Sequence, residues 1–140
     1  MIAIGCDHGG FAMKQEVMKH LKDRGFEVKD CGCHDESSCD YPVYEKAVTD
    51  AVTAGECELG ILICGTGIGM SMAANKVPGI RAALCSDCFS AQATKEHNNA
   101  NVLCMGARTI GVGLALMITD IFVDTPFSND ERHIRRISMF

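Results

Sequence analysis

An apolar run passes directly into a glycine-rich run at residues 59–69, Leu-Gly-Ile-Leu-Ile-Cys-Gly-Thr-Gly-Ile-Gly. Leu59–Cys64 is apolar at nearly every position, which is the pattern of a strand covered on both faces. Residues 65–69 predict a tight loop that leads into a short helix. A buried strand that ends in such a loop is typical of a parallel sheet in an α/β protein.

Short apolar runs alternate with segments of helical period on both sides of this stretch. The regular alternation predicts an α/β fold, with a parallel sheet covered by helices on both faces. At 140 residues, the chain is expected to form one domain, 1–140. We expect strands at 1–6, 26–30, 59–64, 81–86 and 102–105, helices at 11–24, 44–52, 87–97 and 110–123, and a polar loop at 31–42.

The charge balance argues against two classes of partner. Thirteen basic and eighteen acidic residues give a net charge of −5, whereas a nucleic-acid or anionic-membrane surface needs a basic face. The longest apolar stretch, 110–118, is too short to span a bilayer. The N-terminus carries neither a basic leader nor a cleavable apolar segment, so a soluble, cytoplasmic protein is expected.

The nine cysteines are expected to be reduced thiols, because no export signal points to an oxidising compartment. Cys85-Ser-Asp-Cys88 and Cys31-Gly-Cys33-His34 have the spacing of metal ligands. Neither is followed by a second matching pair, so no metal site is predicted.

The segment 110–123 is apolar almost all the way round, whereas a surface helix of a small monomer has a polar face. One explanation is that a second copy covers one side, which predicts a homodimer. The alternative is a helix enclosed within the core of its own chain.

Polar residues gather where the predicted strands end, which is where open parallel sheets bind ligands. Asp7 and His8 follow the first strand, the loop 65–69 follows the third, and Arg108 follows the fifth. His97 and Asn98 end the helix after the fourth strand. We expect all of these residues to form a single site.

The glycine-rich loop has three interpretations. Backbone N–H groups between a strand and a helix form an anion cradle. A dinucleotide fingerprint requires G-x-G-x-x-G, but Met70 occupies the third glycine position. A Walker loop is excluded because no Gly-Lys-Ser/Thr follows. The remaining alternative is a plain tight turn.

Side chains near this loop suggest proton transfer on an anionic substrate. Cys64 precedes the loop, and a helix N-terminus favours the thiolate form of a nearby cysteine; the alternative is a thiol that fills the core. Asp7 and His8 can bind hydroxyls and carry protons, although Asp is also a common helix cap. Arg132 and Arg136, four residues apart, can grip a phosphate dianion or form a solvated basic face, and Arg108 is a third candidate phosphate ligand.

Taken together, these segments resemble ribose-5-phosphate isomerase type B. The resemblance runs from residue 1 to about residue 137, and the Cys-Gly-Thr-Gly-x-Gly and His-Asn segments carry most of its specificity. The matching segments, in the family's order, are Asp7-His8-Gly9-Gly10, Asp40-Tyr41-Pro42, Ile63-Cys64-Gly65-Thr66-Gly67-Ile68-Gly69, Ala73-Ala74-Asn75-Lys76, Gly79-Ile80-Arg81-Ala82, Glu96-His97-Asn98-Asn99-Ala100-Asn101, and Arg132-His133 with Arg136.

The resemblance implies a Rossmann-like αβα sandwich with a five-stranded parallel sheet. It implies a homodimer with active sites at the subunit interface and leaves open whether dimers pair into tetramers. The implied reaction interconverts ribose 5-phosphate and ribulose 5-phosphate through an enediolate, without cofactor or metal.

The resemblance also assigns roles to individual residues. Cys64 would be the base, and the backbone N–H groups of Gly65, Thr66, Gly67, Ile68 and Gly69 would hold the enediolate oxygen. Thr66 and His97 would open the sugar ring, and Asp7 would move protons between the sugar oxygens. Hydroxyl ligands would be Tyr41 and Asn98, and phosphate ligands would be His8, Arg108, Arg132 and Arg136, some of them from the other subunit.

The chain departs from the family at Asp130-Glu131, where Gly-Gly is usual, and these acids are expected to stiffen the turn and weaken phosphate binding. Cys64 argues against the galactose-6-phosphate branch, which generally lacks this cysteine. An allose-6-phosphate/allulose-6-phosphate isomerase is the alternative, because one extra carbon changes only the distance to the phosphate.

The residues also argue against two other protein classes. A nicotinamide-dependent oxidoreductase needs the glycine that Met70 replaces and more chain for a substrate domain. A non-catalytic sugar-phosphate binding module has no need for Cys64 together with His97.

Overall fold

The computed structural model describes all residues, Met1–Phe140. Five parallel strands form one sheet in the order β2-β1-β3-β5-β4. The strong apolar run becomes the central strand β3, which pairs with β1 and β5. The predicted α/β fold is therefore confirmed. The strands are β1 (Ile2–Cys6), β2 (Val28–Asp30), β3 (Leu59–Cys64), β4 (Ala82–Leu84) and β5 (Val102–Gly106).

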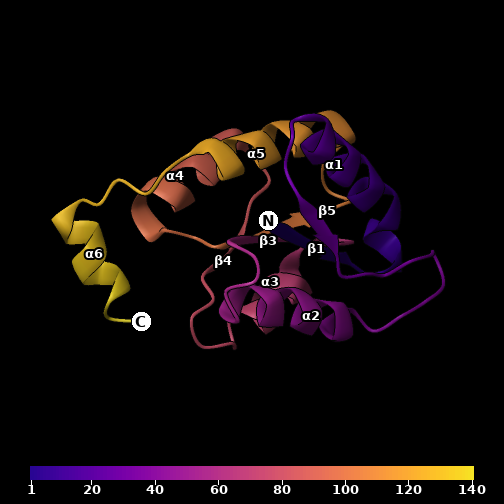
Figure 1. Ribbon diagram of the computed structural model, residues 1–140, viewed down its shortest axis with the longest axis horizontal. Coiled ribbons are helices and arrows are strands. Elements are labelled where there is room, and N and C mark those ends of the chain that lie inside the picture. Colours follow the sequence, from indigo (N-terminus) through magenta and orange to yellow (C-terminus); the bar gives the residue numbers. More distant parts are fainter.

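Helices cover both faces of the sheet, which gives the three layers visible in Figure 1. One face is covered by α1 (Phe11–Asp23), α4 (Cys88–Asn98) and α5 (Val112–Asp124). The other face is covered by α2 (Tyr41–Thr53) and α3 (Ile68–Ala74). A short 3₁₀ turn, η1 (His8–Gly10), links β1 to α1. The last helix, α6 (Glu131–Ile137), lies outside the three layers, beyond one end of the strands (Figure 1).

Alternation along β3 divides the core into two apolar clusters. Ile61 and Ile63 face the layer of α1, α4 and α5. Leu62 and Cys64 face the layer of α2 and α3. The thiol therefore lies at the end of the second cluster, where the strand gives way to the glycine-rich loop.

The turn from β3 into α3 depends on Gly67, which has a φ of +78°. A β-carbon here would lie 2.5 Å from Leu84 Cδ1 and 2.9 Å from the carbonyl carbon of Met105. Only glycine combines this left-handed backbone with so little room. Close packing against the neighbouring strands thus fixes the course of the loop.

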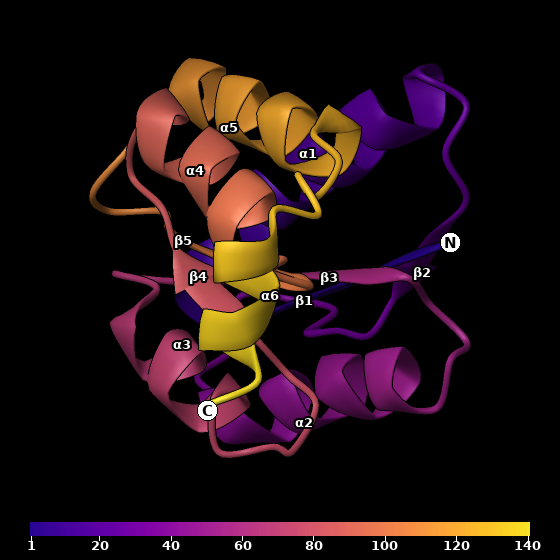
Figure 2. The ribbon, with the colours of Figure 1, turned by 90° about the vertical axis from the view of Figure 1, so that its left-hand side faces the viewer.

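The apolar helix α5 lies beside both α1 and α4 (Figure 2). Ala115, Ile118 and Phe122 are fully buried, whereas Met117 on the outer side is 58 % exposed. The chain itself therefore buries one side of α5, four of its 13 residues, and leaves the apolar side chains of Val112 and Met117 on the surface. No helix has both the length and the apolar character needed to cross a membrane.

Candidate active site

Cys64 ends β3, and only 5 % of its surface is exposed. Its Sγ accepts a hydrogen bond of 3.0 Å from the backbone N–H of Gly67, so the sulfur contacts one amide of the glycine-rich loop. The N–H of Ala107 donates to the carbonyl of Cys64 over 2.8 Å, and that of Arg108 donates to the carbonyl of Gly65 over 2.9 Å. The segments after β3 and β5 are thereby fastened together at the carboxyl edge of the sheet.

The turn after β1 lies against the same loop. Oδ1 of Asp7 accepts a 3.1 Å hydrogen bond from the N–H of Gly10, so this aspartate does cap a short helix. A β-carbon on Gly9 would lie 3.4 Å from Asp7 Oδ1 and 3.7 Å from the nitrogen of Gly65. Asp7 is therefore a neighbour of the glycine-rich loop, and its second oxygen makes no hydrogen bond within the chain.

Three more predicted residues lie at this edge. The ring of Tyr41 packs so closely on Gly69 that a β-carbon there would come within 2.7 Å of its Cζ. The side chain of Arg108 runs alongside Gly65, because a β-carbon added to Gly65 would lie 3.5 Å from Cδ of Arg108. The hydroxyl of Thr66 accepts a hydrogen bond of 3.2 Å from the N–H of Ile68.

His97 and Asn98 lie at the opposite edge of the sheet, so the prediction of a single site within one chain is wrong for these two residues. They form the last turn of α4, just before Asn101, whose carbonyl accepts from the N–H of Gly60 over 2.9 Å. Gly60 is the second residue of β3, whereas Cys64 is the last of its six residues, so the two positions lie roughly 13 Å apart along the strand. The physical reason is that a helix between two parallel strands returns the chain to their starting edge.

The final helix joins His97 at this amino edge. The rings of His97 and His133 stack with centroids 4.5 Å apart and an interplanar angle of 22°. The hydroxyl of Ser128 also donates to the carbonyl of Glu96 over 2.7 Å, which holds the segment before α6. Burial, followed by the nearby His97, lowers the pKa of His133 below its ordinary value.

Arg132 and Arg136 lie on α6 and are exposed. Asp130 caps this helix by accepting from the N–H of Arg132 over 2.9 Å, and its Oδ2 lies 3.5 Å from Nε of the same arginine. Arg136 has no ion-pair partner within the chain. The acid that departs from the family pattern thus stabilises the start of α6 and engages one of the two candidate phosphate ligands.

The chain therefore carries two separate groups of candidate site residues. The carboxyl-edge group comprises Asp7, His8, Tyr41, Cys64, the loop 65–69 and Arg108. The amino-edge group comprises His97, Asn98, Arg132, Arg136 and also His133. The sequence reasoning missed His133 as a partner of His97, and the only available signal was its place between two arginines of the candidate phosphate site. No three side chains of the metal-binding types lie close enough to share an ion.

The chain is similar to known sugar-phosphate isomerases over almost its whole length. The family described as Ribose/Galactose Isomerase matches residues 2–140. Ribose-5-phosphate isomerase B of Escherichia coli is 48 % identical over 136 residues, which are 97 % of this chain and 91 % of that protein. Galactose-6-phosphate isomerase subunit LacB of Clostridium acetobutylicum is 43 % identical over 127 residues, 91 % of this chain and 73 % of the relative.

Solved structures agree with this similarity. Ribose-5-phosphate isomerase B of Clostridium thermocellum superposes with a TM-score of 0.97 at 49 % identity, covering 99 % of this chain and 93 % of that one. The enzyme of Thermotoga maritima gives a TM-score of 0.96 at 48 % identity, covering 99 % and 94 %.

Proposed function

The chain belongs to the ribose/galactose isomerase family, and we propose that it interconverts ribose 5-phosphate and ribulose 5-phosphate by cysteine-based proton transfer. The observation that carries this proposal is the Cys64 sulfur at the end of the central strand, 3.0 Å from the amide nitrogen of Gly67. A base beside preorganised N–H donors is the arrangement that enolisation of a sugar requires.

In the forward direction, the Cys64 thiolate removes the proton from C2 of the open-chain aldose. The electrons of that C–H bond form the C1–C2 double bond, and the carbonyl oxygen becomes the enediolate oxygen. The loop amides stabilise this oxygen because their dipoles are already oriented toward developing negative charge. Asp7 moves a proton between O1 and O2, and return of the proton from Cys64 to C1 gives the ketose.

Ring opening must precede this step, and it is assigned to Thr66 and His97, which the fold holds at opposite edges. We therefore propose a homodimer in which the amino-edge group of one copy completes the site at the carboxyl edge of the other. Exposed arginines on α6 support this arrangement, because a phosphate needs cations that the carboxyl edge supplies only through Arg108.

The surface beside α6 supports assembly with a second copy. A broad groove lies between edge strand β4, the start of α4 and the end of the chain. Leu84, Phe89 and Phe140 contribute to its lining and are 43 %, 80 % and 80 % exposed. Apolar side chains gathered at this level mark an interaction surface rather than an ordinary solvent face. A cytoplasmic location is part of the same proposal, because all nine cysteines are free thiols, as suits a reducing compartment.

The test is proton NMR in deuterated water with ribose 5-phosphate and, separately, allose 6-phosphate. We expect the wild type to introduce deuterium at C1 or C2 of the pentose phosphate more rapidly than of the hexose phosphate. Cys64→Ala should lower this rate at least about 100-fold, which is the lower end for a general base.

Cys57→Ala is the matched control, because Cys57 is buried in the same apolar cluster but precedes β3 instead of ending it. This variant should keep its turnover. Near-normal exchange in Cys64→Ala would contradict the role of the thiol. Faster exchange with allose 6-phosphate than with ribose 5-phosphate would show that the hexose phosphate is the preferred substrate.

A further inference from the structure

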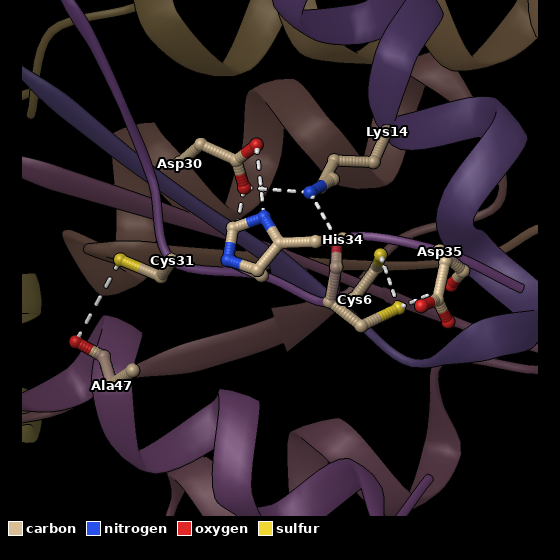
Figure 3. A network of polar contacts seen from close by, with 9 residues as sticks. Cys6, Lys14, Asp30, Cys31, His34, Asp35 and Ala47 are labelled. Atoms are coloured by element: carbon tan, nitrogen blue, oxygen red, sulfur yellow. Dashed lines mark hydrogen bonds and ion pairs between the residues drawn. The ribbon is translucent and has the colours of Figure 1, made fainter. Parts of the chain in front are cut away.

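Lys14 is a lysine whose side chain is completely buried, on the face of α1 that packs on the sheet. Its Nζ donates to Oδ1 of Asp30 over 2.6 Å and to the carbonyl oxygen of Cys33 over 2.6 Å. Figure 3 shows the ammonium between the aspartate and the chain that follows β2. Burying an ammonium costs free energy unless hydrogen-bond acceptors surround it. The contact therefore holds the Asp30 carboxylate and the Cys33 carbonyl in place.

The contact holds the first part of the segment 31–39. Oδ1 of Asp30 also accepts from the N–H of Gly32 over 2.9 Å. The N–H of Cys33 in turn donates to the carbonyl of Cys6 over 2.9 Å, and the N–H of Cys6 donates to the carbonyl of Gly32 over 2.7 Å. Lys14 therefore fastens the segment to the last residue of β1, immediately before Asp7 and His8.

The far part of the same segment reaches His8. The backbone N–H of Cys39 donates to Nδ1 of His8 over 3.3 Å, and the Cys39 thiol lies 3.9 Å from the same atom. A ring nitrogen that accepts from an amide carries no proton. In the neutral imidazole, the proton must then reside on Nε2.

We propose that Lys14 is a positioning residue that acts through the segment 31–39 to hold His8 in its Nε2–H tautomer. His8 then meets the substrate phosphate as a fixed hydrogen-bond donor. Lys14 itself touches no substrate. This inference rests on the proposed function for the phosphate contact, whereas the tautomer is a property of the free protein.

The first experiment observes the tautomer directly. Long-range proton–nitrogen NMR of the free protein at pH 8 should show His8 with a bare Nδ1 and a protonated Nε2, the signal being assigned by its loss in His8→Asn. Lys14→Met should give a mixture of the two tautomers. Cys39→Ala keeps the amide and removes only the thiol, so it should leave the tautomer unchanged.

Lys95→Met is the matched control for losing a buried ammonium. Lys95 is 7 % exposed, and its Nζ donates to the carbonyl of Ala100 over 3.1 Å at the other edge of the sheet. The His8 signal should be unchanged in this variant. An unchanged tautomer in Lys14→Met, or a tautomer that shifts equally in Lys95→Met, would overturn the proposal.

The second experiment measures kinetics with ribose 5-phosphate. Lys14→Met should raise KM roughly 10- to 100-fold, the loss expected for one hydrogen bond to a charged group, with a much smaller change in kcat. His8→Asn should have a similar effect, and the double variant should be no worse than His8→Asn alone, because both changes remove the same contact. Additive losses would show that Lys14 acts by another route.

Asp30→Asn replaces Lys14→Met in both experiments if Lys14→Met fails to fold. It keeps the shape of the side chain, which is 30 % exposed, and weakens the same contact. If none of the proteins isomerises the pentose phosphate, the function fails while the NMR result still decides the tautomer.

Discussion

Glu45 on α2 is buried to 5 % exposure, and its Oε1 has no hydrogen-bond partner. Burial raises the pKa of this carboxyl, so folding favours its protonated form. The stability that this carboxyl contributes is therefore present at low pH. It is lost as the pH rises from about 4.3, the ordinary pKa of a glutamate, through the raised pKa of the folded chain. We expect Glu45→Gln to increase the free energy of unfolding at pH 8 by about 1–3 kcal/mol, the cost of a buried unpaired group.

Urea denaturation at pH 8 and at pH 4.5 checks this expectation, and the gain should shrink at the lower pH. Glu16→Gln on the exposed face of α1 is the control and should change little at either pH. A Glu45→Gln protein that is less stable than the wild type at pH 8 would show that the carboxylate has a partner in solution.

Single residues also show where sequence reasoning works and where it stops. Cys64 could be placed because strand ends and glycine-rich turns are marked in the sequence, whereas Tyr41 was assigned only through the family resemblance; the structure brings both to one loop. Lys14 could not be placed, because a charged side chain is expected on the solvent face of a helix. Its partner Asp30 lies 16 positions away, and no local pattern links the two residues.

At the scale of elements, α6 contacts α4, and His133 stacks on His97 in this contact. The lowered pKa of His133 means that the folded chain resists its protonation. As the pH falls below about 6.5, the ordinary value for histidine, the detached helix gains a proton more readily than the docked one. The charged and titratable groups around this ring are His97, Arg132, Asp130 and Arg136.

We therefore expect α6 to loosen between pH 7 and pH 5.5. Hydrogen exchange of the amides of residues 131–137, corrected for the intrinsic pH dependence, should speed up over this range. His133→Phe keeps a stacking ring without a titrating group, so its protection should not change with pH. Equal pH dependence in both proteins would assign the effect to another residue.

Most elements could be predicted because most of the strands are short apolar runs and the long helices show helical periodicity. The edge strands β2 and β4 are shorter than expected, because each has a partner on one side only. The position of His97 is set by the parallel order of the strands, because α4 must carry the chain back to their starting edge. The residues around His97 do not mark this return, so the prediction that His97 lies beside Cys64 in one chain is wrong.

At the scale of the whole molecule, the two groups of site residues make shared sites testable by mixing variants. Cys64→Ala and His97→Ala, co-expressed with two different tags, form mixed dimers that can be purified through both tags. One of the two sites in each mixed dimer then carries both native residues, so activity should recover to about half of the wild type.

Cys64→Ala paired with Asp7→Asn is the control, because both changes fall in the carboxyl-edge group. Every site of that mixed dimer keeps one defect, and no activity should return. If the first pair also stays inactive, the site is built within one chain or the assembly differs from the one proposed.

The position of α6 outside the three layers has a consequence for how activity depends on the amount of protein. In the homodimer proposed above, each chain holds Cys64 at one edge of the sheet and His97 at the other, so a single chain is expected to be inactive until it meets a partner. Dilution below the dissociation constant of that dimer is then expected to abolish turnover without unfolding the chain. On this proposal, the encounter between two copies, rather than the completion of folding, starts activity.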